Sequence, residues 1–280
     1  MSIKRKFTST ITALLKTCMH LFGSSRANLI LAQMAEELPP IIIQKTEFGS
    51  IKFFCPGRLP EWRARTLLSK EPETIAWINT FKSNDTLWDI GANVGSYTLY
   101  AALKKITVLA FEPSPSNYYL LSRNVEINKM DDKISALCIA FNDSTKLDSF
   151  FMSNSELGGA LNSFGEAVNW QGKPFVATLK QTMLGFSIDD FIQKFNPPFP
   201  NHIKIDVDGI ENKIVMGAQK TLADKRVKTV LIELDSNRED YCNQVIEILK
   251  KAGIALLRKE PGPISENVVN ITHNYIFVRP

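Results

Sequence analysis

The residues whose types and spacing most suggest chemistry form a short strand–turn–helix pattern. The apolar segment 86–90 contains Asp89, and a turn with Gly91, Asn93 and Gly95 follows it before a predicted helix. Glycine lets the backbone bend sharply and approach a ligand, and free N–H groups at a helix start face that ligand. The G-x-x-x-G spacing differs from the G-x-G-x-x-G that binds a dinucleotide pyrophosphate. The acid beside the turn instead favours a positively charged ligand such as S-adenosylmethionine.

A second acid ends the next apolar segment, residues 106–112. Glu112 lies about twenty residues beyond the turn, where a Rossmann-like unit places the carboxylate that binds a ribose. The Pro-Ser-Pro-Ser sequence at 113–116 also predicts a helix start that Glu112 could cap. Together the two acids predict a cofactor site at the ends of neighbouring strands.

From residue 85 onward, predicted strands and helices alternate. Strands are expected near 86–90, 106–111, 135–140, 202–207, 228–234, 253–257 and 273–279, and helices near 95–104, 115–128, 210–222 and 239–252. This alternation predicts a Rossmann-like α/β fold with a doubly wound, mostly parallel sheet. Because only a loop fits between the last two strands, we expect them to pair as an antiparallel C-terminal hairpin.

Ligands of an open parallel sheet bind beyond the carboxyl ends of its strands. This rule gathers the polar residues Asp89, Glu112, Asn142, Asp143, Asp206 and Asp208 at one edge. Asn142 and Asp143 follow the third strand and are placed to contact an adenine, although an Asx turn would equally explain them. Asp206 ends the fourth strand, beside the position expected for the methyl group of a bound S-adenosylmethionine. It is the predicted catalytic base, with Lys204 on the same strand face; a helix N-terminal charge is the alternative.

Several motifs together resemble the FkbM-type S-adenosylmethionine-dependent methyltransferases over about residues 50–280. They are D-I-G-A-N-V-G-S-Y-T (89–98), F-E-P-S-P (111–115), I-K-I-D-V-D-G-I-E (203–211), I-E-L (232–234) and K-E-P-E-T-I-A-W-I (70–78). The resemblance implies that S-adenosylmethionine is the cofactor and that Glu71 and Thr74 contact its amino-acid end. It also implies a small-molecule or glycan acceptor, methylated at a hydroxyl of a sugar, glycolipid or secondary metabolite. Asp208 stands where the family pattern has glutamate.

Two other functions are alternatives to methyl transfer. An NAD-dependent oxidoreductase would share the acid after the second strand but needs the absent G-x-G-x-x-G turn. A non-catalytic cofactor-binding or assembly module would keep the turn without turnover. A further question is whether Asp206, Asp208 and Glu233 hold Mg²⁺; we predict no metal, because Gly209 should end the strand that would align the two aspartates.

The chain divides into three predicted parts. Residues 1–25 form an amphipathic arm, and residues 26–82 an extension with a small β element over 28–58 and a helix over 71–82. Residues 83–280 form the cofactor-binding domain, with an insertion at about 143–186 expected to act as a lid or substrate wall.

The arm places Phe7, Ile11, Leu14, Leu15, Cys18 and Phe22 on one helical face. Its apolar run is too short and interrupted to span a bilayer, and Lys16 and His20 interrupt any signal-peptide core. Residues 7–22 should therefore contact the rest of the domain, a second copy of the chain or a membrane surface. The net charge of +4, without a basic stripe, excludes nucleic acid as the expected partner. Four cysteines without C-x-x-C spacing indicate a cytoplasmic protein, at most peripheral to a membrane.

Overall fold

The structure is a computed structural model that describes residues 3–19, 21, 23–261 and 272–280. The chain forms two compact units, Met1–Pro40 and Ile41–Pro280. The first contains helices α1 (Ile3–Met19) and α2 (Ser24–Glu37). The β element expected over 28–58 is therefore wrong for residues 28–37, whose apolar side chains recur at helical spacing until the Pro39-Pro40 pair ends the helix.

The second unit begins with an antiparallel hairpin and two short helices. Strands β1 (Ile41–Thr46) and β2 (Gly49–Phe54) pair with each other. Helix α3 (Arg58–Arg65) follows, and then α4 (Pro72–Asn79), whose first residue is a proline at the position where its fixed φ suits a helix start. These elements bring residues 57–70 close to the main domain.

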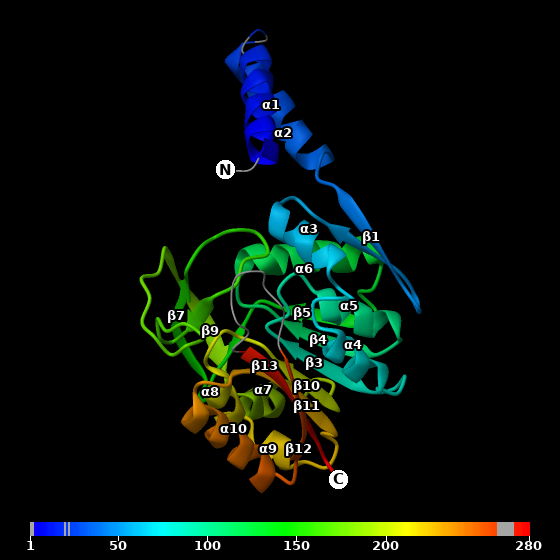
Figure 1. The fold of residues 1–280 in the computed structure, drawn as a ribbon, viewed down its shortest axis with the longest axis vertical. Coiled ribbons are helices and arrows are strands. Elements are labelled where there is room, and N and C mark those ends of the chain that lie inside the picture. The colour runs from blue at the N-terminus through cyan, green and yellow to red at the C-terminus, as the bar shows by residue number, and fades with distance from the viewer. Residues whose placement is uncertain (1–2, 20, 22, 262–271) are drawn as a thin grey trace. The chain divides into compact units, whose positions relative to one another are not determined.

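The described residues of the main domain form a seven-stranded sheet in the order β12-β13-β11-β10-β3-β4-β5 (Figure 1). Its strands are β3 (Thr86–Ile90), β4 (Thr107–Phe111), β5 (Ile134–Leu137), β10 (His202–Ile205), β11 (Thr229–Asp235), β12 (Ala255–Pro261) and β13 (Thr272–Val278). The five strands from β11 to β5 run parallel. The predicted antiparallel pairing of the last two strands is confirmed, and β13 in addition inserts between β11 and β12.

Helices cover both faces of this sheet (Figure 1). Alternate residues of a strand point to opposite faces, so Leu87 packs with α4, α5 (Ser96–Leu103) and α6 (Pro115–Asn128), whereas Trp88 packs toward the other face. The second face carries α7 (Ile188–Phe195), α8 (Glu211–Met216), α9 (Gln219–Ala223) and α10 (Glu239–Lys251). The predicted Rossmann-like class is confirmed, although the helix expected over 210–222 is broken into α8 and α9.

The insertion forms a second, four-stranded sheet within the described chain, in the order β6-β9-β7-β8. Its strands are β6 (Ala140–Phe141), β7 (Lys146–Met152), β8 (Asn162–Phe164) and β9 (Leu179–Phe186). Phe150 and Phe164 from this sheet are buried in the same core cluster as Trp88. Helix α7 begins directly after this sheet, and the Ser187 hydroxyl caps it by accepting a hydrogen bond from the Asp190 N–H.

Candidate active site

The turn after β3 depends on glycine for a steric reason. Gly91 has φ +85°, and a Cβ there would lie 1.9 Å from the carbonyl oxygen of Asp206. The N–H groups of Gly91 and Ala92 both donate to the carbonyl oxygen of Phe111, at 2.9 and 3.1 Å. The turn is thus held between the ends of β4 and β10, and its backbone lies where a ligand at the sheet edge would approach.

Asp89 lies in β3 just before this turn, and only one of its two carboxylate oxygens accepts a hydrogen bond from a described residue. The Thr98 hydroxyl donates to Oδ2 at 2.6 Å. Oδ1 is buried and has no hydrogen-bond partner among the described residues, and the Lys204 ammonium is 3.9 Å away from it. Burial raises the pKa of Asp89, and the Lys204 charge only partly opposes that rise. An unsatisfied buried acceptor is costly, so Oδ1 is suited to receive a donor from a ligand.

Glu112 directly follows β4, and backbone N–H groups hold its buried carboxyl group in place. The N–H of Asn93 donates to Oε2 and the N–H of Ser114 to Oε1, each at 2.8 Å. Burial raises the pKa of Glu112 to about 7, although these hydrogen bonds and the Arg63 charge act in the opposite direction. Ligand hydroxyl groups that donate to this carboxylate would favour its ionised form.

A charged cluster lies at the end of β10. The Lys204 ammonium is 2.7 Å from Asp206 Oδ2 and only 2% exposed. Although burial disfavours ionisation, the Lys204 and Lys70 charges hold the pKa of Asp206 well below its ordinary value. Burial and the charges of Asp206 and Glu71 raise the pKa of Glu233. Glu233 lines the same cavity as Asp206, so the acids of this cluster differ in the direction in which their pKa values are shifted.

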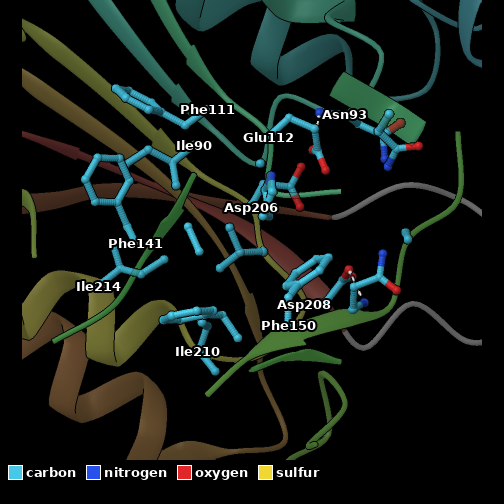
Figure 2. A pocket seen from close by; sticks show the side chains of 18 of the residues that line it. Ile90, Asn93, Phe111, Glu112, Phe141, Phe150, Asp206, Asp208, Ile210 and Ile214 are labelled. Carbon is cyan, nitrogen blue, oxygen red and sulfur yellow. Dashed lines mark hydrogen bonds between the residues drawn. The ribbon is translucent and has the colours of Figure 1, made fainter. Parts of the chain in front are cut away.

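These groups surround a cavity of about 170 Å³ between the edge of the main sheet and the insertion (Figure 2). Its polar wall consists of Arg63, Lys70, Asn93, Glu112, Asn117, Asn162, Asp206, Asp208 and Glu233. Its apolar wall includes Ile90, Phe111, Phe141, Phe150, Phe164, Ile210 and Ile214. One end therefore suits a flat apolar ring, and the other suits hydroxyl and charged groups.

A smaller cavity of about 30 Å³ adjoins the first one. Its wall includes Asp89, Tyr97 and Lys204. The two cavities share Arg63, Lys70, Gly91, Asn93 and Asp206. The pair thus extends from the apolar end, past Glu112, to the unsatisfied oxygen of Asp89.

The loop between β7 and β8 forms part of the wall of the main cavity. The carbonyl oxygen of Gly159 accepts from Asn93 Nδ2 at 2.8 Å and from Asn117 Nδ2 at 3.0 Å. The neighbouring carbonyl of Gly158 accepts from Arg63 Nε at 2.8 Å. These hydrogen bonds join the insertion directly to the glycine turn and to α3.

Most of the residues proposed from sequence lie on these walls, and some do not. Glu71 and Thr74 lie behind the wall: Glu71 Oε1 is 2.6 Å from the Lys70 ammonium, and the Thr74 hydroxyl donates to Glu71 Oε2 at 3.2 Å. Gly95, with φ +85°, forms the left-handed N-cap of α5 and allows Leu121 to pack close against it. These three residues position the wall without lining it.

Asn142 and Asp143 lie outside both walls. The third strand ends at Leu137 rather than near 140, and the chain then enters the second sheet. Asn142 donates its backbone N–H to Phe186, and Asp143 is exposed. As a result, Phe141 and the two residues before it reach the cavity instead.

Sequence reasoning did not assign Arg63, Lys70, Asn117 or the two phenylalanines of the insertion to the site. The Gly158-Gly159 pair, whose carbonyls contact Arg63, Asn93 and Asn117, is a local signal from which the approach of the insertion could have been inferred. No three His, Cys, Asp or Glu side chains among the described residues gather in an arrangement that could hold a metal ion. Asp206 instead pairs with Lys204.

The strand order and the glycine turn define a Rossmann-like protein, a class whose ligands bind at this edge of the sheet. Residues 89–254 match the methyltransferase FkbM domain. The chain therefore belongs to the FkbM methyltransferase family, and it is a methyltransferase.

Two curated relatives and one solved structure illustrate the similarity. The hexuronic acid methyltransferase AglP of Haloferax volcanii is 24% identical over 69% of this chain and 73% of its own length. Methyltransferase 1 of Beauveria bassiana is 25% identical over 65% of this chain and 76% of its own. A putative transferase of Pyrococcus horikoshii has a TM-score of 0.46 at 12% identity, covering 85% of this chain and 71% of its own.

Proposed function

We propose that the protein transfers a methyl group from S-adenosylmethionine to a hydroxyl oxygen of a sugar, glycolipid or secondary metabolite. The observation that supports this most is the buried, unpartnered Oδ1 of Asp89 beside the glycine turn. An ammonium group would satisfy that oxygen. The amino-acid end of S-adenosylmethionine carries one, and a dinucleotide carries phosphates that Asp89 and Asp206 would repel.

The remaining walls fit the rest of this cofactor. Glu112 offers two carboxylate oxygens toward a ribose diol, and the apolar wall around Phe111 and Phe141 suits an adenine. When bound, S-adenosylmethionine supplies the methyl group and a sulfur leaving group. The protein's own contribution is to position the acceptor oxygen and to remove its proton.

Asp206 is the residue that we propose receives that proton, with Lys204 positioning it. Its lowered pKa makes it a weak base, but an oxygen that is gaining a methyl group becomes strongly acidic. Even a weak carboxylate base can therefore accept the proton late in the reaction. Asp208 lines the same cavity, and burial raises its pKa to about 6, which makes it a second candidate base.

The cofactor is tested first, by measuring the thermal stability of the protein with S-adenosylmethionine, S-adenosylhomocysteine, NAD and NADP. A ligand that binds the native state raises the melting temperature. We expect stabilisation by the first two compounds alone. Stabilisation by NAD or NADP instead would indicate an oxidoreductase.

The acceptor is then sought among hydroxylated sugars and metabolites, including hexuronic acids because of the relative AglP. On a confirmed acceptor, Asp206→Asn should lose about a hundredfold in kcat, while its affinity for S-adenosylhomocysteine stays within about tenfold of wild type. Asp208→Asn is the matched comparison. If only Asp208→Asn loses turnover, the base is Asp208; if neither does, the enzyme works by positioning alone.

A further inference from the structure

Two cations on the cavity walls come from the segment that precedes the family domain. Arg63 belongs to α3, and Lys70 lies in the turn before α4. Both line the larger and the smaller cavity, so they lie where the two adjoin. Both precede the matched residues 89–254, and the family resemblance gives a role only to Glu71 and Thr74 in this segment.

The surrounding walls make these cations distinctive. Among the described residues that line the larger cavity, Arg63 and Lys70 are the only cations, and Glu112, Asp206, Asp208 and Glu233 are its acids. An anionic group of a ligand would be repelled along most of this surface. Within the larger cavity, it would be accommodated next to Arg63 and Lys70, because Lys204 in the smaller cavity is already paired with Asp206.

Both side chains keep donors free for such a group. Arg63 uses Nε to bind the Gly158 carbonyl, and its two terminal nitrogens have no hydrogen-bond partner among the described residues. Lys70 is held by Glu71 at 2.6 Å, which leaves two of its three N–H donors. A planar guanidinium with two free nitrogens is suited to a carboxylate.

We infer that Arg63 and Lys70 form a carboxylate-binding site at the junction of the two cavities. This inference rests on the proposed function, which supplies two sources of a carboxylate: the amino-acid end of the cofactor, or an acidic acceptor. The first source would place the carboxylate near the ammonium group expected at Asp89. The second would make the protein select acidic sugars.

The test compares Arg63→Gln and Lys70→Gln with Arg65→Gln, a control on the same helix whose side chain is 63% exposed and lines neither cavity. Calorimetry measures binding of S-adenosylhomocysteine and of 5′-methylthioadenosine, which lacks the amino-acid part. If the cofactor is the source, the two site variants weaken S-adenosylhomocysteine at least tenfold and leave 5′-methylthioadenosine unchanged.

If an acidic acceptor is the source, both nucleosides bind normally and KM rises at least tenfold for acidic acceptors but not for neutral ones. The inference is overturned if both site variants match Arg65→Gln in S-adenosylhomocysteine affinity and no acidic acceptor shows a raised KM. A wild-type protein that binds neither nucleoside refutes the proposed function itself and the inference with it.

A separate observation concerns the N-terminal unit. Helix α1 exposes the apolar side chains of Phe7 (68% exposed) and Leu14 (66% exposed), which lie on one face together with Ile11 and Leu15. In α2, Ala27 is buried and Leu29 is exposed as a single apolar residue. Within the N-terminal unit, the apolar face of α1 is therefore left uncovered.

The charge of this unit indicates which partner. The basic residues of the first 35 positions are Lys4, Arg5, Lys6, Lys16 and Arg26, and the first acidic residue is Glu36. A helix with an apolar face and purely basic charge fits the surface of an anionic membrane. None of the helices formed by the described residues combines the length and apolar character needed to cross a bilayer.

We propose that α1 lies in the interface of an anionic lipid membrane. The 280-residue chain should co-sediment with phosphatidylcholine vesicles that contain phosphatidylglycerol, and at least tenfold less with vesicles of phosphatidylcholine alone or at high salt. Phe7→Glu with Leu14→Glu should abolish this binding, whereas Leu29→Glu, at an exposed apolar residue of α2, should not. Absence of vesicle binding, or a double variant that binds normally, would overturn the proposal. The proposal would also be overturned if light scattering showed that the double variant dissociates an oligomer while its vesicle binding is unchanged.

Discussion

Glu112 should make cofactor binding depend on pH in a range where most carboxylates do not titrate. Burial raises its pKa to about 7 in the ligand-free protein. The carboxylate form accepts hydrogen bonds from a ribose diol, whereas the protonated form offers one acceptor fewer. Binding therefore selects the ionised form, and the affinity should be highest above pH 7.

The size of the effect follows from the ionised fraction. Two pH units below a pKa of about 7, only about 1% of Glu112 is ionised, so the affinity at pH 5 should be about a hundredfold lower than the plateau. This corresponds to about 2.7 kcal/mol, at 1.36 kcal/mol per pH unit. Residual binding by the protonated form would make the measured loss smaller.

Calorimetric titration with S-adenosylhomocysteine at pH 5, 6, 7 and 8 measures this dependence. Glu112→Gln keeps the size of the side chain but does not titrate, so its affinity should be low and nearly constant. Any slope that remains in this variant would report another acid of the two cavities, such as Asp208, whose pKa is raised to about 6. A wild-type affinity that is constant between pH 5 and 8 would refute the assignment of Glu112 to the ribose.

Three other changes test separate parts of the structure. Asp89→Asn should weaken S-adenosylhomocysteine by about ten- to a hundredfold, from the loss of a charge-assisted hydrogen bond, and wild-type affinity in calorimetry would remove Asp89 from the site. Gly91→Ala should destabilise the fold by about 3 kcal/mol or more in urea unfolding, because its Cβ would lie 1.9 Å from a backbone oxygen. Gly57→Ala, whose Cβ would be 3.6 Å from its neighbour, should fold normally, and equal losses in both would contradict the steric argument. Burial lowers the pKa of His202 to about 4, so its contribution to stability is complete above about pH 6.5 and falls as the pH drops toward 4. The loss should reach about 3 kcal/mol and be absent from His202→Gln.

Local sequence signals were sufficient to find the strands of the main sheet and the acids near the ends of β3, β4 and β10. Asp89 and Glu112 lie at the ends of β3 and β4, as the strand pattern predicts, because both positions are set by a few neighbouring residues. Asp206 likewise follows β10 directly. The antiparallel pairing of the last two strands followed from the short connection between them.

The parts that were missed depend on contacts between segments far apart in the chain. Asn142 and Asp143 lie outside the cavity walls because the preceding strand β6 pairs with β9. This pairing joins segments that are separated by more than forty residues. Arg63 reaches the cavity only because α3 is fastened to the insertion at Gly158. No periodicity or local motif around either position could reveal such a contact.

The position of β13 has a consequence for the order of folding. This strand follows β12 along the chain but lies between β12 and β11, and pairs with both. Neither neighbour can complete its backbone hydrogen bonds on that side until residues 272–278 have arrived. Nascent chains that lack this segment would expose the edge of β11, whose residues Val230, Leu231 and Ile232 are fully buried in the finished sheet. Such an unpaired edge is prone to aggregate. We therefore expect that the nascent protein stays prone to aggregation until residues 272–278 leave the ribosome and β13 pairs with β11 and β12.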